Sequence, residues 1–314
     1  MSALPMTASA AGDAAEPQAA LRARLFEAKL LYPLGVTGLY GYSATYQSIL
    51  DAVDAMVTRW GTSLDAERIY FPPVIARSTF DHTNYLQSFP HLMGSVHIFT
   101  GDDREHRALL GRLEAGQDWP ALLEPAEVVL SSATCHSLYP LVTGTLPAHG
   151  RYYAVRGTCF RHEPSVDPTR MQSFGMHEVV FLGEPADAQA HRDVGLAHGL
   201  ELLSALGLVM EAVPANDPFF GRLGTALAVG QLEESLKMEG VTTICPGTPP
   251  TAIMSANCHR DHFGRPFAIT TADGAVAHSS CVAFGVDRIA IALLQAHGLV
   301  PERWPADVIG RLWP

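Results

Sequence analysis

Hydrophobic side chains recur at helical spacing in three stretches of the chain. Over residues 44–60 they follow one another at intervals of three and four, which predicts a helix with one buried face. The apolar positions there are Ile49, Leu50, Val53, Met56, Val57 and Trp60. A second helix is expected over 187–206, with Gly207 as its stop. The stretch GVDRIAIALL, from Gly285 to Leu294, predicts a third helix that is mostly buried.

The third helix carries a charge in an unexpected place. Arg288 stands in its first turn, where unpaired backbone N–H groups already give partial positive charge. A buried cation at that end of an apolar helix is electrostatically unfavourable unless an anion lies close by. The sequence therefore predicts an anionic partner for Arg288.

Short apolar stretches predict strands along the rest of the chain. They lie in ERIYFPPVIA, where a short strand ends at Pro72–Pro73, around 151–163, at 173–183, and at VTTICP, AIMSANCH, PFAITTA and AHSSCVAF between 241 and 285. Most of these strands would be joined by loops and not by helices, which favours an antiparallel β-sheet flanked by helices, an α+β fold. We expect one domain over residues 21–314, after a disordered, Ala-rich tail at 1–20.

Composition narrows the class of protein. The chain has 21 Lys and Arg against 32 Asp and Glu, a net charge of −11, and no Lys- or Arg-rich run. A protein that grips nucleic acid usually has a basic patch, so such a role is disfavoured. No apolar run reaches the ~20 residues that span a bilayer, and the Ala-rich start does not resemble a signal peptide. Five scattered cysteines fit a reduced, cytoplasmic protein better than a disulfide framework.

The segment CFRHEPSVDPTRMQSFGMHEVVFLG, residues 159–183, collects charged and aromatic residues on two expected strands. Alternation gives each strand one such face. These faces hold Cys159, Arg161 and Glu163 on the first strand and Phe174, Met176 and Glu178 on the second. Guanidinium groups, including Arg170 of the connecting loop, suit phosphate, while a ring suits a base and a carboxylate suits an exocyclic amine. The segment predicts a nucleotide site or, alternatively, a hairpin with a solvated polar face.

Three segments, taken in order, resemble the motifs of class II aminoacyl-tRNA synthetases. The helix at 44–60 and the strand after it resemble motif 1, the dimer-forming element. Residues 161–178 resemble motif 2, and FGVDRIAIALL resembles motif 3, whose arginine is Arg288. The ordered trio, spread over about 250 residues, is far more specific than any one motif. The resemblance implies a class II synthetase-like catalytic domain that forms a homodimer.

ATP is the anion that this resemblance implies. Arg288 would bind the γ-phosphate and Arg161 the α-phosphate, and both would act in catalysis by neutralising charge. Arg170 belongs to the same implied ATP site. Class II enzymes usually carry a Mg2+-binding glutamate where this chain has Ala252, so Mg2+ would be held with ATP by other groups or by the phosphates alone.

The nucleoside has its own implied contacts. Phe174 would stack on adenine, and Glu163 and the backbone of Met171 would meet the edge of the base. The backbone from Ala252 to Ser255 would line the ribose.

Two further segments indicate a branch of the family. LKMEG, at 236–240, and IMSANCHRDHFGR, at 253–265, are similar to the seryl-type catalytic core. The similarity is greater to the seryl enzymes of methanogens, and greater still to their bacterial relatives, the amino acid:[carrier protein] ligases. Those ligases lack a tRNA-binding domain and load a small amino acid, such as glycine or alanine, onto the phosphopantetheine thiol of a carrier protein. The acidic charge fits them, so no tRNA partner is expected.

The same segments imply contacts for the amino acid. The implied residues are Lys237, Glu239 and Asn257. Lys237 and Glu239 fit an exposed helix end equally well.

The resemblance also implies one zinc ion per subunit. In those relatives two cysteines and the motif 2 glutamate hold the ion and leave one position for the α-amino group of the substrate. The matching residues are Cys135, Glu178 and Cys281. Three protein ligands with an open position are typical of a functional rather than a structural zinc site. A competing cluster with metal-like spacing is Cys258, His259 and His262.

Two other functions stay open. A tRNA-charging or protein-aminoacylating paralogue would need a basic flank or an extra domain, and we find neither. A non-catalytic regulatory subunit would be expected to lose motif arginines, and Arg161, Arg170 and Arg288 are all present. The favoured hypothesis is an AMP-forming ligase that activates a small amino acid with ATP and transfers it to a carrier protein.

Overall fold

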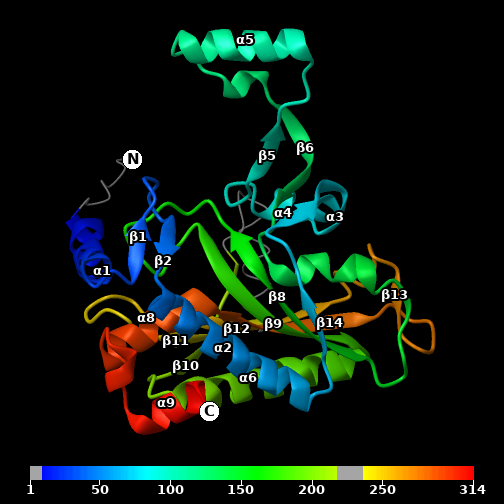
Figure 1. Ribbon diagram of the computed structural model, residues 1–314. Helices are drawn as coiled ribbons and strands as arrows, with labels where there is room; N and C mark the ends of the chain where they lie inside the picture. The colour runs from blue at the N-terminus through cyan, green and yellow to red at the C-terminus, as the bar shows by residue number, and fades with distance from the viewer. Residues whose placement is uncertain (1–8, 218–235) are drawn as a thin grey trace, which may run out of the picture.

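A seven-stranded sheet forms the centre of the computed structural model, which describes residues 9–217 and 236–314 (Figure 1). The strand order is β10-β11-β12-β14-β9-β8-β3. Neighbouring strands are antiparallel except β3 and β8, which run parallel. The strands are β3 (Glu67–Tyr70), β8 (Arg151–Phe160), β9 (Ser173–Gly183), β10 (Glu211–Pro214), β11 (Lys237–Thr242), β12 (Thr251–Arg260) and β14 (His278–Gly285). The predicted α+β class is confirmed.

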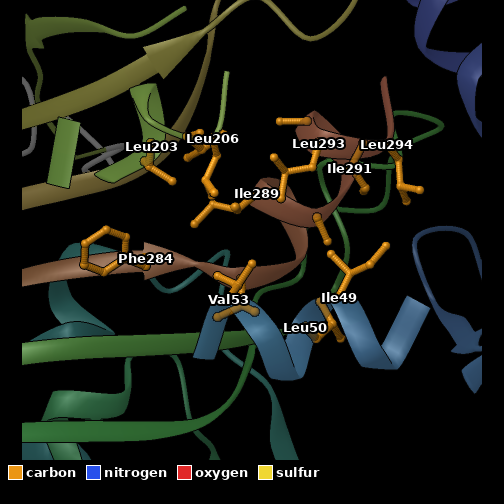
Figure 2. Packing of buried hydrophobic residues seen from close by; sticks show 14 of the residues in the cluster. Ile49, Leu50, Val53, Leu203, Leu206, Phe284, Ile289, Ile291, Leu293 and Leu294 are labelled. Carbon is orange, nitrogen blue, oxygen red and sulfur yellow. The ribbon is translucent and has the colours of Figure 1, made fainter. Parts of the chain in front are cut away.

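Helices cover one face of this sheet (Figure 1). They are α2 (Ala44–Ser63), α6 (Pro185–Ser204), α8 (Val286–His297) and α9 (Ala306–Leu312). In Figure 2, Ile49 and Val53 of α2 meet Ile289 of α8 and Phe284 of β14 in one apolar cluster. All four side chains are fully buried, and removing a large one from such a core costs about 2–5 kcal/mol. The three helices predicted from hydrophobic spacing are confirmed.

The opposite face of the sheet is the polar one. Because side chains alternate along a strand, Val179 and Val282 point into the helical layer. Their neighbours Glu178 and Cys281 point the other way, into a cavity. The alternation therefore puts the chemistry-bearing residues on the face that α2, α6 and α8 leave free.

Smaller sheets surround the polar face. β1 (Leu31–Pro33) pairs with β2 (Tyr40–Tyr42), and β7 (Gly144–Thr145) pairs with β13 (Ile269–Thr270). β4 (Val74–Ala76), β6 (Glu124–Leu130) and β5 (Ser95–Ile98) form an arm that carries α5 (Asp103–Glu114) away from the body (Figure 1). The remaining helices are α1 (Ser9–Glu27), α3 (Arg77–His82), α4 (Tyr85–Ser88), and the 3-10 turns Pro120–Leu122, Thr134–Ser137, Tyr139–Leu141 and Pro301–Arg303.

Several predicted boundaries were wrong. β8 ends at Phe160, so Arg161 and Glu163 lie beyond the strand, in the loop that leads to β9. Lys237 and Glu239 lie in β11 and not at a helix end, so that alternative is wrong. VTTICP is a strand only to Thr242, where the pairing of β11 with β12 ends.

Part of the N-terminal segment is helical. α1 begins at Ser9, inside the segment 1–20 for which a disordered tail is expected; the domain boundary at residue 20 stays a prediction. Residues 1–8 lie outside the described residues. None of the helices that the structure describes combines the length and hydropathy needed to traverse a bilayer.

Candidate functional site

One cavity of about 620 Å³ opens on the polar face of the sheet. It is lined by most of the residues that the sequence singled out. These are Cys135, Arg161, Met171, Phe174, Glu178, Lys237, Glu239, Ala252, Ser255, Asn257, Cys281 and Arg288. Glu163 and Arg170 are not among the lining residues; Arg170 Nη1 lies 3.9 Å from Glu163 Oε2 beside the cavity. Segments far apart in the sequence thus share one compartment.

Backbone carbonyl groups hold Arg288 in place. Its Nε donates to the carbonyl oxygen of Thr169 at 2.9 Å, and its Nη1 donates to that of Ala252 at 2.9 Å. Desolvation, together with the nearby Arg161 and Arg170, lowers the pKa of the Arg288 guanidinium to about 10. Carbonyl groups offset the charge only in part, so the site favours an added anion.

Arg161 is held from another direction. Its Nε donates to the carbonyl oxygen of Ser132 at 3.3 Å, and its guanidinium carbon lies 5.5 Å from the centre of the Phe174 ring. A cation near an aromatic ring is stabilised by the ring quadrupole. Phe174 is therefore a flat surface beside a cation, and an aromatic base with attached phosphates matches this arrangement.

The β11–β12 side of the cavity carries a charged group of its own. Lys237 Nζ pairs with Asp217 and, at 3.2 Å, with Glu239 Oε1. The side chains of Lys237 and Glu239 are only 12% and 24% exposed, which is unusual for an unpaired Lys or Glu. Asp217, which sequence reasoning missed, had no motif to mark it. The next residues, 218–235, lie outside the described part.

Two thiols and a carboxylate converge at the other end of the cavity. One ligand atom from each of Cys135, Glu178 and Cys281 lies within 4.8 Å of the others. All three residues are at least 97% buried, and the Cys135 N–H donates to Glu178 Oε1 at 2.9 Å. Hydrogen bonding to Cys281, followed by burial, raises the pKa of the Cys135 thiol well above its usual value. A divalent cation that displaced the thiol protons would stabilise the thiolates against burial and the Glu178 charge. Sulfur with carboxylate is a donor set that suits zinc.

The competing cluster of Cys258, His259 and His262 does not converge in this way. His259 Nδ1 is 3.0 Å from Ser279 Oγ, and His262 Nε2 is 3.3 Å from the carbonyl oxygen of Thr83. Within residues 9–217 and 236–314, the triad is the one group of three His, Cys, Asp or Glu side chains whose ligand atoms lie close enough together to hold a metal ion. His259 Nε2 nevertheless lies 3.6 Å from Cys281 Sγ, as a neighbour of the triad. Asn257 Nδ2 is 3.5 Å from the same sulfur.

Buried imidazoles line the wall next to the triad, and sequence reasoning missed one of them. His136 follows Cys135 and is 8% exposed, and its Nδ1 has no hydrogen-bond partner among the residues that the structure describes. Burial, then the charges of His262 and Arg161, lowers the pKa of His136 to about 3. Burial lowers the pKa of His259 to about 3 as well. Both rings are neutral at pH 7.

The sequence is similar to that of known proteins over most of its length. No protein-family model matches it. Amino acid–[acyl-carrier-protein] ligases 1 and 2 of Bradyrhizobium diazoefficiens are each 40% identical to it, over 89% of this chain and 86% and 84% of their own lengths. The type-2 serine–tRNA ligase of Methanopyrus kandleri is 25% identical over 86% of the chain, which spans only 55% of that protein.

Solved structures agree on the fold. The M. kandleri SerRS in complex with A. aeolicus tRNASec superimposes with a TM-score of 0.79 at 21% identity, over 93% of this chain and 60% of that one. Seryl-tRNA synthetase from Pyrococcus horikoshii, complexed with ATP, gives 0.66 at 12% identity, over 88% of this chain and 58% of that one. The chain therefore has the class II synthetase fold.

Proposed function

The chain belongs to the amino acid–[acyl-carrier-protein] ligase family, and we propose that it activates a small amino acid with ATP and transfers it to the phosphopantetheine thiol of a carrier protein. It is an enzyme that forms aminoacyl thioesters. The observation that carries the proposal is the single cavity with cations at one end and the thiol–carboxylate triad at the other. One end suits ATP and the other suits the α-amino group of an amino acid.

The first step is formation of an aminoacyl-adenylate. A carboxylate oxygen of the amino acid bonds to the α-phosphorus of ATP, while the bond from that phosphorus to the bridging oxygen breaks and pyrophosphate leaves. The carboxylate is already a nucleophile at pH 7, so no general base is required. Arg161 at the α-phosphate and Arg288 at the γ-phosphate would neutralise the developing charge. Support comes from their carbonyl-held side chains, which need little reorganisation to bind phosphate.

Adenine and the Mg2+ that accompanies ATP would be bound by different groups. Phe174 would stack on adenine, with Met171, Glu163 and Arg170 at its edge and the β12 backbone from Ala252 to Ser255 at the ribose. Mg2+ would enter with ATP and be held chiefly by phosphate oxygens and water, its usual ligands in such sites, since the side chain of Ala252 offers no oxygen. A solved relative of the same fold is complexed with ATP.

Cys135, Glu178 and Cys281 would hold a zinc ion. Bound there, zinc would act as a Lewis acid that favours the neutral form of the substrate α-amine. The protein around it would orient the amino acid: Asn257 lies beside Cys281, and Lys237 and Glu239 line the same cavity. We propose glycine or alanine as the substrate, because the cavity that holds the triad is also lined by the bulky His136 and Phe263 rings, whose centres are 5.8 Å apart.

The second step is attack by the carrier thiol. Its sulfur bonds to the carbonyl carbon of the adenylate, the bond from that carbon to the phosphate oxygen breaks, and AMP leaves with the thiol proton released to solvent. A thiol is intrinsically very nucleophilic, so this step needs little from the protein beyond access.

Amino-acid-dependent ATP–pyrophosphate exchange, measured with all twenty amino acids, tests the first step. We expect exchange with one or two small amino acids, and exchange with none would overturn the proposal. With ATP, Mg2+ and the active amino acid, we expect a hydroxylamine-labile thioester on a phosphopantetheinylated carrier protein. Charging of bulk tRNA at a rate comparable to exchange would replace the carrier assignment and leave the ATP site intact.

A homodimer of single-domain subunits over residues 21–314 is part of the proposal. β3 is an edge strand of the sheet, and Tyr70 at its end is 60% exposed. A two-fold contact would cover such an edge. Light scattering at micromolar concentration is expected to give about 68 kDa, twice the 33.8 kDa chain, and a stable monomer would reject this part.

A further inference from the structure

Asp287 is a buried carboxylate at the junction of four elements. It is the second residue of α8 and is 2% exposed. Its Oδ2 accepts from the backbone N–H of Gly175 in β9 at 2.6 Å. Tyr46 of α2 lies 3.3 Å from its Oδ1 and 3.4 Å from its backbone oxygen. Tyr42 of β2 also interacts with the carboxylate and approaches Met171 Sδ at 3.6 Å.

The carboxylate does not serve as the counter-ion of the next residue. The Arg288 guanidinium is directed to the carbonyl groups of Thr169 and Ala252, on other segments. Burying an ionisable carboxylate costs desolvation free energy unless hydrogen bonds offset this cost. The bonds that Asp287 makes join α8 to β9, α2 and β2. Gly175 directly follows Phe174, so one bond connects the strand of the proposed stacking ring to the helix of the proposed phosphate-binding arginine.

We propose that Asp287 is a positioning residue for adenylate formation, whose ionised carboxylate holds Phe174 on β9 and Arg288 on α8 in register. Tyr46 extends this connection to α2, the helix next to the proposed dimer edge. The proposal rests on the proposed function, because it assumes that Phe174 and Arg288 bind ATP. A misplacement of either group by 1 Å weakens binding of the transition state steeply.

The charge state of Asp287 should therefore matter. Burial raises the pKa of the Asp287 carboxyl to about 6, against hydrogen bonds from Gly175, Tyr42 and Tyr46 that lower it. Of the charged groups nearby, Asp54 on α2 raises that pKa, while the guanidinium of Arg288 on α8 is directed to the carbonyl groups of Thr169 and Ala252. Asp54 itself pairs with Arg156 and His177. Burial raises the pKa of both tyrosines, so they stay donors. Acidification below pH 6 would replace a charge-assisted bond to Gly175 by a weaker neutral one.

Two substitutions separate positioning from general structure. Asp287→Ala removes both acceptors, and Asp287→Asn keeps an oxygen for the Gly175 N–H but cannot ionise. The matched control is Asp307→Ala, an exposed aspartate at the start of α9. For Asp287→Ala we expect KM for ATP to rise on the order of tenfold, KM for the amino acid to stay within about twofold, and zinc content to be unchanged. Equal loss of zinc, ATP and amino-acid binding would mean a structural role and would overturn the proposal.

The pH profile gives a second readout that a packing role would not move. The γ-phosphate of ATP titrates near pH 6 as well, so the wild type is compared with Asp287→Asn in the same buffers. Below pH 6, KM for ATP should rise more in the wild type than in Asp287→Asn, and identical profiles would overturn the proposal. If Asp287→Ala fails to fold, this comparison decides alone. Calorimetric binding of ATP at pH 5.5 and 7.5 applies even if no amino acid supports exchange, so failure of the proposed function is distinguishable.

Discussion

The two ends of the cavity are electrostatically incomplete in opposite senses. At one end, Arg161 and Arg288 are charged and held by backbone carbonyl groups, which offset their charge only in part. At the other end, Cys135 is protonated because its surroundings raise the pKa of the thiol, and deprotonation there requires a cation. The arginines carry their charge and are held in position before a ligand binds. The thiols become charged only when a metal ion binds.

Because of this difference, the two ends should tolerate amino-acid substitutions unequally. A preformed arginine can lose one phosphate contact and leave the rest of the cavity intact. A three-ligand metal site has no such reserve, since each residue supplies one of only three protein ligands and its loss leaves a buried carboxylate or thiol unpaired. The largest effects of substitution are therefore expected at the triad.

Cys281→Ala should break the metal end and leave the phosphate end in place. We expect zinc retention to fall to background and adenylate formation to drop on the order of 10³, because a Lewis acid worth several kcal/mol is lost. Binding of ATP alone, measured by calorimetry, should change little. The matched control is Cys245→Ala, a buried thiol outside the cavity lining, which should keep its zinc. Full zinc content in Cys281→Ala would exclude this residue as a ligand.

Arg288→Ala tests the reverse. Adenylate formation should fall on the order of 10², through loss of a charge-assisted phosphate contact, while zinc content stays at the wild-type value. Stability should suffer little, because removing a positive charge from a helix N-terminus is not in itself harmful. The matched control is Arg303→Ala, an exposed arginine in a 3-10 turn. Normal pyrophosphate exchange in Arg288→Ala would mean that motif 3 has been misassigned.

The residues proposed for the phosphate end could be singled out from the sequence because they sit in local patterns. Arg288 is conspicuous as a cation in an apolar helix, and Phe174 stands in a strand with clear alternation. Local spacing could not reveal the triad, whose members lie 43 and 103 residues apart along the chain (135, 178 and 281). They meet through the pairing of β9 with β14 and the packing of the Thr134–Ser137 turn against these strands. The resemblance supplied those residues, and the structure shows that they converge.

What the sequence could not predict shares one physical cause. Asp217 and Asp287 act through contacts with distant segments: Asp217 with Lys237, and Asp287 with Gly175 and Tyr46. Neither contact leaves a period or spacing in the chain. Strand ends were also misjudged near Glu163 and Thr242, because hydrogen-bond partners and not apolarity set where a strand stops.

Phe174→Leu probes the neutral contact within the charged end. Leucine keeps much of the buried area but has no face for a base and no quadrupole for Arg161. We expect KM for ATP to rise about tenfold, the lower part of the range for loss of base stacking, with zinc content unchanged. Phe99→Leu, on the arm and 38% exposed, is the control. An unchanged KM would show that the ring does not contact adenine.

The smallest expected effect concerns stability, and it follows from the same carboxylate that is proposed to align the phosphate end. The folded-state pKa of Asp287 is raised from 3.8 to about 6, so the folded protein binds this proton more readily than the unfolded chain. The stabilisation is thus complete below about pH 4 and lost as pH rises through 6. Asp287→Asn has no such titration. Between pH 5 and 7.5, the free energy of unfolding of the wild type, measured with urea, should therefore fall relative to Asp287→Asn by about 1 kcal/mol. A difference that stayed constant over this range would show that the carboxyl titrates as it does in solvent, and the proposed pH dependence of ATP binding would lose its physical basis.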